Sequence, residues 1–239
     1  MNAVQNIFIP PMRLKNIVVA EFDQSATAEY TEFPGGYCAG LTLNWLNMRL
    51  RNQDWPATQA DGQTAINATT GAITYRSYTK FQQGRLKEMS AVNVVTRAVG
   101  GSDKIGLIES VPVTQLRAAI ESVAGGLNLE IDSEVKVWAE GVEGHIFMHE
   151  AIVLGVGLYY LSMITKMPGG DDQGHAVGLH IYESSTDTDC EFFDPNLGQF
   201  HFDNPLDFRW ASYDLFKAYT AAYGFNFYRG ALFRLKKKY

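Results

Sequence analysis

The last third of the chain alternates short runs of strand-forming residues with turn signals, and this pattern constrains the fold more than any other. β-Branched and aromatic residues fill the runs, while proline, glycine, aspartate and asparagine fill the gaps at 168–172 and 195–198. Such runs favour β-strands, and such gaps favour tight turns that reverse the chain. We therefore expect an antiparallel sheet here. The expected strands are 157–164, 175–182, 191–193, 199–202 and 225–235.

The front half has a different pattern, in which apolar residues recur at helical spacing. Leu41, Trp45 and Met48 predict a helix that begins at Cys38 and stops near Asn52, before a Trp-Pro pair. The other expected elements are helices over 114–124, 78–95 and 207–223, strands over 16–22 and 72–75, a half-buried strand or hairpin over 127–140, and a loop over 57–71.

This layout belongs to the α+β class, with a helical front half that carries Cys38 and packs on an antiparallel sheet. Residues 1–34 are expected to form an irregular lead-in that contains one short strand. Residues 35–239 are expected to form a single domain, because no internal repeat or long linker interrupts them.

Charge and hydropathy exclude several classes of function. The net charge of −6 gives no reason to expect nucleic acid as a partner. The basic run at 234–238 indicates a solvated chain end, so membrane association is not expected. The apolar run at 151–164 is too short to cross a bilayer. The first residues contain no basic segment followed by an apolar core, so no cleavable signal peptide is expected.

Cysteine is rare, and the two cysteines lie in different surroundings. Cys38 follows the glycine pair at 35–36 and opens a helix, where unpaired N–H groups and the positive dipole end favour a thiolate. Cys190 precedes an aromatic strand and is expected to be a buried or edge thiol. A single disulfide between them stays open, but it would consume the Cys38 thiol, and a reducing compartment fits better.

Three residues form a constellation that suits nucleophilic catalysis. His175 begins one expected strand and Asp194 ends the next, so the two side chains could lie side by side. Thiol hydrolases need a thiolate, an imidazole that takes and returns a proton, and a carboxylate that orients the imidazole. The hypothesis is therefore that Cys38 is the nucleophile, His175 the base and acid, and Asp194 the orienting group.

Three segments of the chain resemble a known family. They are residues 36–46 (GYCAGLTLNWL), 174–178 (GHAVG) and 193–202 (FDPNLGQFHF). Their order and spacing resemble the YopT/AvrPphB family of papain-like cysteine proteases, known chiefly as bacterial effectors. Papain-type enzymes place the histidine about 130–150 residues after the cysteine, and here the separation is 137 residues. The resemblance implies a papain-like fold and the same three roles for Cys38, His175 and Asp194.

The resemblance also implies partners and a location. The expected substrate is a protein, in the family a host protein, and a secretion chaperone is a further expected partner. The protein would be a secreted virulence effector that acts in the host cytoplasm through a thioester intermediate. No cofactor and no metal site are expected. His145 and His149 are four residues apart and would share a face on a helix, but their order is not the His-Glu-x-x-His pattern of zinc peptidases.

One departure from the papain pattern concerns the oxyanion hole. Papain-like enzymes usually carry a Gln or Asn five or six residues before the cysteine, whereas this chain has Phe33 and Glu32 there. A carboxylate at Glu32 would oppose a developing negative charge. The Cys38 backbone N–H together with Gln24 is therefore the expected oxyanion donor set.

Two alternatives to proteolysis stay open. A related acyl-transfer enzyme, such as a deamidase, transglutaminase or acyltransferase, can use the same Cys-His-Asp triad on another acceptor. A non-catalytic papain-like binding module is the second alternative, and Glu32 at the usual oxyanion position is the feature that suggests it.

Overall fold

The computed structural model describes most of the chain, and everything below concerns those residues. The described residues are 1–33, 36–50, 68–77, 117–118, 120–121, 124–138, 145–166, 172–184 and 187–239.

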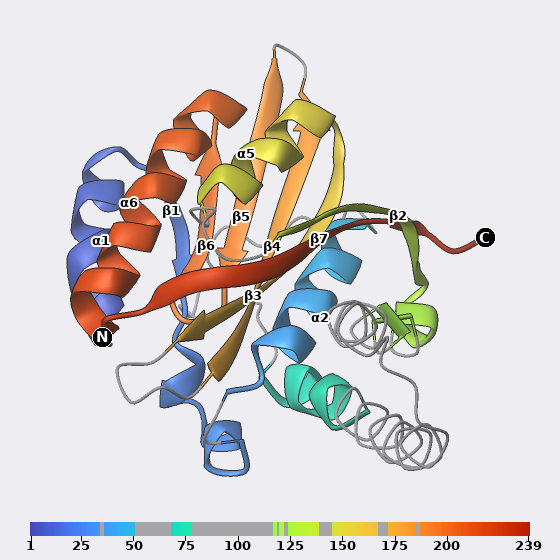
Figure 1. Cartoon of the computed structure of the whole chain (residues 1–239), viewed down its shortest axis with the longest axis horizontal. Helices are drawn as coiled ribbons and strands as arrows, with labels where there is room; N and C mark the ends of the chain where they lie inside the picture. The colour runs from blue at the N-terminus through green and yellow to red at the C-terminus, as the bar shows by residue number, and fades with distance from the viewer. Residues whose placement is uncertain are drawn as a thin grey trace, which may run out of the picture.

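A single antiparallel sheet of seven strands forms the centre of the described structure (Figure 1). The strand order across the sheet is β1-β6-β5-β4-β3-β7-β2, and each neighbouring pair is antiparallel. The strands are β1 (Val18–Glu21), β2 (Leu129–Trp138), β3 (Gly157–Lys166), β4 (Asp172–Glu183), β5 (Thr188–Asp194), β6 (Gly198–Phe202) and β7 (Asn226–Lys237). The antiparallel sheet expected from the alternating runs is therefore confirmed.

Helices cover the two faces of this sheet, and each face has its own apolar core. One core, called the α6 core below, lies between the sheet and helices α1 (Ala3–Leu14), α5 (His145–Leu154) and α6 (Pro205–Tyr223) (Figure 1). The other, called the α2 core, lies between the sheet and α2 (Cys38–Leu50). Side chains of a strand point alternately to its two faces. Accordingly, Tyr159 and Leu161 of β3 enter the α6 core, whereas Leu158 and Tyr160 enter the α2 core. The architecture is α+β, as predicted.

The expectation of an irregular lead-in is wrong, because helix α1 occupies Ala3–Leu14 and two short 3₁₀ helices follow strand β1. Pro10 and Pro11 lie inside this helix, where proline removes a backbone hydrogen bond and disfavours helix. Burial offsets that cost, since Val4, Phe8 and Ile9 are almost fully buried against the α6 core. The Asn2 side chain also caps the helix and forms a capping box with Gln5. The division of the chain at residue 34 stays a prediction.

A second expectation fails at residues 72–75, which carry strand-forming side chains but lie in a helix over 68–77. Periodicity alone cannot distinguish a short apolar run in a strand from one in a buried helix. The helix packs closely on α2, because a Cβ added at Gly40 would lie 2.2 Å from the carbonyl oxygen of Gly71. Tertiary packing thus decides this segment. The expected elements over 57–67 and 78–95 and the expected start at Thr114 lie outside the described residues.

Several other elements agree with the sequence, although helix α5 was not expected. Helix α2 begins at Cys38, and β2 covers most of the alternating segment. Helix α6 ends at Tyr223, and the φ of 67° at Gly224 suits the left-handed C-cap. Among the residues that the structure describes, no helix combines the length and the apolar character that a membrane crossing requires.

Candidate active site

The three candidate catalytic residues come from one helix and two neighbouring strands. Cys38 is the first residue of α2, while His175 lies on β4 and Asp194 ends β5, the strand paired with β4. His175 Nε2 lies 3.1 Å from Asp194 Oδ1. All three side chains are largely buried, and Cys38 and His175 line the same cleft. The structure therefore brings together the three residues that the sequence analysis selected.

Helix α2 is seated on the sheet by specific contacts close to this cleft. The Thr42 hydroxyl donates a hydrogen bond of 3.1 Å to the carbonyl oxygen of Ala176, the residue after His175. Trp45 stacks on Phe193, the residue before Asp194, with ring centroids 5.6 Å apart. A Cβ at Gly178 would lie 2.8 Å from the Trp45 ring, so only glycine leaves room for this indole. These contacts hold helix α2, which begins at Cys38, against the strands that carry His175 and Asp194.

The electrostatics of the site favour a charged imidazole. Burial by itself would lower the pKa of His175, but the negative charge of Asp194 and its hydrogen bond act in the opposite sense. A side-chain hydrogen bond with Cys38 acts in the same direction as Asp194, and together they raise the pKa of His175 to about 10. Because Nε2 faces Asp194, Nδ1 is the ring nitrogen left for the thiol. The arrangement favours an imidazolium that stabilises a neighbouring thiolate.

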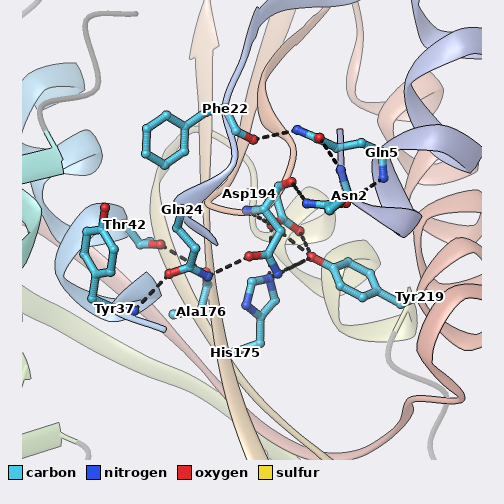
Figure 2. Close-up of polar contacts among 11 residues, drawn as sticks. Asn2, Gln5, Phe22, Gln24, Tyr37, Thr42, His175, Ala176, Asp194 and Tyr219 are labelled. Atoms are coloured by element: carbon cyan, nitrogen blue, oxygen red, sulfur yellow. Dashed lines mark hydrogen bonds and ion pairs between the residues drawn. The ribbon is translucent and has the colours of Figure 1, made fainter. Parts of the chain in front are cut away.

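Asp194 is fully buried, and donors surround its carboxylate (Figure 2). The Tyr219 hydroxyl lies 3.1 Å from Oδ1 and 2.9 Å from Oδ2, and the Asn196 backbone N–H donates to Oδ1 at 2.8 Å. Burial, and then the charge of Asp194, raise the pKa of Tyr219 well above its usual value. Tyr219 therefore stays protonated and acts as a donor. These contacts satisfy the buried carboxylate that also meets His175 Nε2.

Gln24 reaches the same cleft from the short 3₁₀ helix Gln24–Ala26. Its side-chain oxygen accepts from the Tyr37 backbone N–H at 2.9 Å, and Nε2 donates to Asn196 Oδ1 at 2.6 Å. The side chain packs 3.2 Å from the position of a Cβ on Gly36, whose φ is +89°. Glycine at this position is thus required both by the backbone and by the approach of the Gln24 amide. The role of Gln24 in an oxyanion hole stays a prediction.

Glu32 and Phe33, at the positions where papain-like enzymes carry an amide, make contacts elsewhere. The Glu32 carboxylate forms a bidentate ion pair with Arg76, with Arg76 Nε 2.6 Å from Oε1. This pair lowers the pKa of Glu32, so the group stays ionised and bound to its guanidinium. Phe33 packs on Tyr37 and Tyr75. A carboxylate at the oxyanion position suggested a non-catalytic module. In the structure this carboxylate is bound to the Arg76 guanidinium.

The cleft has a volume of about 270 Å³ and a mixed lining. Its lining includes the polar residues Gln24 and Asn196 and the candidate pair Cys38 and His175. It also includes three aromatic residues, Tyr30, Tyr223 and Phe225. A cleft of this kind can hold one side chain or a short stretch of extended peptide.

The other candidate residues lie apart from this cleft. Cys190 is fully buried on β5 and is not disulfide-bonded, and burial raises the pKa of its thiol well above the usual value. His145 and His149 lie on α5. Within the described part of the chain, no group of three or more His, Cys, Asp or Glu side chains could hold a metal ion.

Two polar residues of the site were not selected from the sequence. Asn196 lies in the Asp-Pro-Asn turn, and its position directly after Asp194 was a usable signal. Tyr219 lies on the inward face of α6, 25 residues after Asp194, where it is indistinguishable from a core aromatic. Only the three-dimensional fold shows that its hydroxyl meets the carboxylate.

Comparisons with known proteins find one matching family model and a similar solved structure. The Peptidase C58 family model, described as the Yersinia/Haemophilus virulence surface antigen, matches residues 156–228. That segment includes His175 and Asp194 but not Cys38. Among solved structures, the fold matches the crystal structure of the Pseudomonas avirulence protein AvrPphB with a TM-score of 0.61 and 17% sequence identity, covering 93% of this chain and 99% of that one. No curated protein sequence matches the chain.

These findings confirm the resemblance to the YopT/AvrPphB-type family that the three motifs indicated, and they confirm the α+β fold class. The AvrPphB likeness is a likeness of fold. The family match adds that residues 156–228 are similar to a peptidase family described by a virulence surface antigen.

Proposed function

We propose that the protein is a cysteine protease that cleaves a peptide bond of a protein substrate through Cys38, His175 and Asp194. The observation that carries this proposal is the buried His175–Asp194 pair, with 3.1 Å between Nε2 and Oδ1, beside a thiol at a helix N-terminus. The family match over 156–228 supports the same class of chemistry.

The proposed reaction begins with the ion pair of thiolate and imidazolium. The Cys38 sulfur attacks the carbonyl carbon of the scissile bond, and the carbonyl electrons move to the oxygen. As the tetrahedral intermediate collapses, the C–N bond breaks and His175 gives its proton to the leaving amine. A thioester remains on Cys38. Water then attacks the thioester carbonyl carbon while His175 takes its proton. When this second tetrahedral intermediate collapses, the C–S bond breaks, the acid product leaves and the pair of thiolate and imidazolium is restored.

The oxyanion of both tetrahedral intermediates needs donors. The first N–H groups of a helix have no partner within the helix, so the Cys38 N–H at the start of α2 is one proposed donor. The Gln24 amide, which lines the cleft, is the second. Removing one such donor typically costs about a hundred- to a thousand-fold in rate.

The family resemblance extends the proposal to biology. We propose a host protein as substrate, secretion as the route and the host cytoplasm as the place of action, with a secretion chaperone as partner before export. Identifying the substrate requires screening of host proteins. An intact-mass readout would distinguish a cut chain from the small mass change that a deamidase, transglutaminase or acyltransferase would leave.

The first test is the rate of iodoacetamide alkylation of Cys38 as a function of pH, with the wild type compared to His175→Ala. A thiol paired with an imidazolium should react on a plateau that extends well below pH 7, and the mutant should lose that plateau. Cys38→Ala supplies the background from Cys190. A wild-type curve that rises only near pH 8.5, as for an ordinary thiol, would contradict the proposed function.

A further inference from the structure

A chain of hydrogen bonds connects the Asp194 carboxylate to the Gln24 amide. The Tyr219 hydroxyl lies 2.9 Å from Asp194 Oδ2, and Asn196 Nδ2 donates to the Tyr219 oxygen at 3.0 Å. Gln24 Nε2 donates to Asn196 Oδ1 at 2.6 Å, and the Tyr37 backbone N–H donates to Gln24 Oε1 at 2.9 Å. Figure 2 shows Gln24 facing Tyr37 at one end of this chain and Tyr219 facing Asp194 and His175 at the other.

The direction of every bond in this chain follows from its last acceptor. An ionised carboxylate accepts only, so the single Tyr219 proton goes to Asp194 and the Tyr219 oxygen is left to accept. The Asn196 amide must then turn its NH₂ group to Tyr219 and its oxygen to Gln24. Gln24 in turn has to present its own NH₂ group to Asn196 and its oxygen to the Tyr37 N–H. No link can be reversed while Asp194 is charged.

We propose that Asn196 is a positioning residue that fixes the orientation of the Gln24 amide, so that the second Nε2 hydrogen is available to the oxyanion. The inference rests on the proposed function. It adds that the carboxylate which orients His175 also sets the oxyanion donor, through Tyr219 and Asn196. One ionised group thereby aligns both the proton carrier and the oxyanion hole.

The backbone around Asn196 allows its side chain to be tested separately. Its N–H donates to Asp194 Oδ1 at 2.8 Å, and the Leu197 N–H donates to the Asp194 carbonyl oxygen at 3.0 Å. Both bonds come from the main chain and persist when the side chain changes. Asn196→Asp keeps the size of the side chain but replaces the donor to Tyr219 with a second acceptor. Two acceptors repel each other, so the side chain must turn away from the Tyr219 oxygen and shift the group to which Gln24 donates.

Two small reagents separate the oxyanion hole from the reactivity of the thiol. Iodoacetamide reacts in a direct displacement in which the C–S bond forms as the C–I bond breaks, so no oxyanion arises. With p-nitrophenyl acetate, the thiolate adds to the ester carbonyl, an oxyanion forms, and p-nitrophenolate leaves to give the acetyl thioester. The ratio of the acylation rate to the alkylation rate therefore reports on the oxyanion hole and needs no natural substrate.

Four variants of the full chain test the proposal at one pH on the alkylation plateau. Gln24→Ala should lower the ratio by about a hundred- to a thousand-fold, and Asn196→Asp by about tenfold or more because the amide is misaligned and not lost. Gln24→Ala/Asn196→Asp should match Gln24→Ala alone. Asn204→Ala, which removes the N-cap of α6 away from the cleft, is the control for lost stability and should keep the wild-type ratio.

A purely structural role for Asn196 predicts different results. In that case Asn196→Asp would leave the ratio unchanged, or would lower it by the same factor with and without Gln24, and either outcome would overturn the proposal. If Asn196→Asp fails to fold, Tyr219→Phe breaks the next link and must lower the ratio for the proposal to stand. Loss of the wild-type alkylation plateau below pH 7 is a separate result, which would overturn the proposed function itself.

Discussion

Strand β5 carries two buried carboxylates, and each meets a histidine of the neighbouring strand β4. Asp194 Oδ1 lies 3.1 Å from His175 Nε2, and Glu191 Oε2 lies 3.3 Å from His180 Nδ1. The two pairs use similar groups at similar distances, yet they face opposite sides of the sheet. The Asp194 pair faces α6 through Tyr219, while the Glu191 pair faces α2 through Arg49.

The difference between the pairs lies in their third partner. Glu191 forms a buried ion pair with the Arg49 guanidinium and also accepts from Gln199 Nε2 at 3.3 Å. Asp194 has neutral donors and His175 around it, so its charge acts on the imidazole and raises the pKa of His175. A carboxylate–histidine pair is therefore not a sign of catalysis by itself. The Glu191–His180 pair lies beside the Arg49 cation, which fits a structural role. The Asp194–His175 pair lies beside the Cys38 thiol, which fits a catalytic role.

Neutralising each carboxylate in turn gives the largest expected contrast. Asp194→Asn should reduce acylation of Cys38 by p-nitrophenyl acetate by up to roughly 10⁴-fold, because an amide can leave the imidazole in the wrong tautomer. Glu191→Gln should change that rate only a few-fold but lower the free energy of unfolding. Acylation kinetics and urea unfolding of both variants measure the two effects. Equal loss of activity in the two variants would break the comparison.

Removing the cation tests the structural pair directly. Arg49→Met leaves Glu191 buried without its guanidinium, and breaking a buried ion pair in this way costs about 3–5 kcal/mol of stability. Arg49→Met/Glu191→Gln removes the uncompensated charge as well and should recover part of that loss. Urea unfolding of the wild type, both single variants and the double variant gives the coupling energy. A coupling energy near zero would mean that Arg49 does not hold this pair.

The two pairs also differ in how well the sequence predicts them. Cys38, His175 and Asp194 were selected from the residues because a helix start, a strand start and a strand end carry recognisable signals. His180 alternates with apolar residues along its strand, a pattern typical of a structural residue, and it contacts Glu191. The Arg49–Glu191 pair was not anticipated, because Arg49 sits on an apolar helix face and its partner is 142 residues away. Pairings over such distances depend on packing that no local pattern records.

The same limit explains the elements that were missed. Helix α1 contains two prolines, which argue against a helix locally, and only the buried face that packs in the α6 core offsets them. Residues 72–75 carry strand-forming side chains but lie in a helix, where close packing on α2 decides the structure. Strands with clear alternation and bounding turns were found, because there the local and the tertiary signals agree.

Gly178 lies on β4 between His175 and His180, so a substitution there disturbs both regions together. A Cβ at this position would meet the Trp45 ring at 2.8 and 2.9 Å, and overpacking of this kind costs about 1–3 kcal/mol. Trp45 also donates to Gln199 at 3.1 Å, which links it to the Glu191 pair. Gly178→Ala should therefore lower the unfolding midpoint and slow alkylation of Cys38. Gly126→Ala, with no atom near its Cβ, is the control.

The last expected effect is a difference in how stability depends on pH. The pKa of His175 rises from an unfolded value of 6.5 to about 10 in the folded protein, so between these values the folded state holds a proton that the unfolded state has lost. The stability from this group is present below pH 6.5 and is lost as pH rises through about 10, with a slope of up to about 1.4 kcal/mol per pH unit. His175→Ala should flatten the fall in unfolding free energy between pH 7 and 9, whereas His180→Gln should leave it in place because His175 remains. Urea unfolding of the three proteins across that range measures the slopes. If His180→Gln flattened the curve and His175→Ala did not, the charged imidazole would belong to the Glu191 pair, and the two regions would have to exchange their assigned roles.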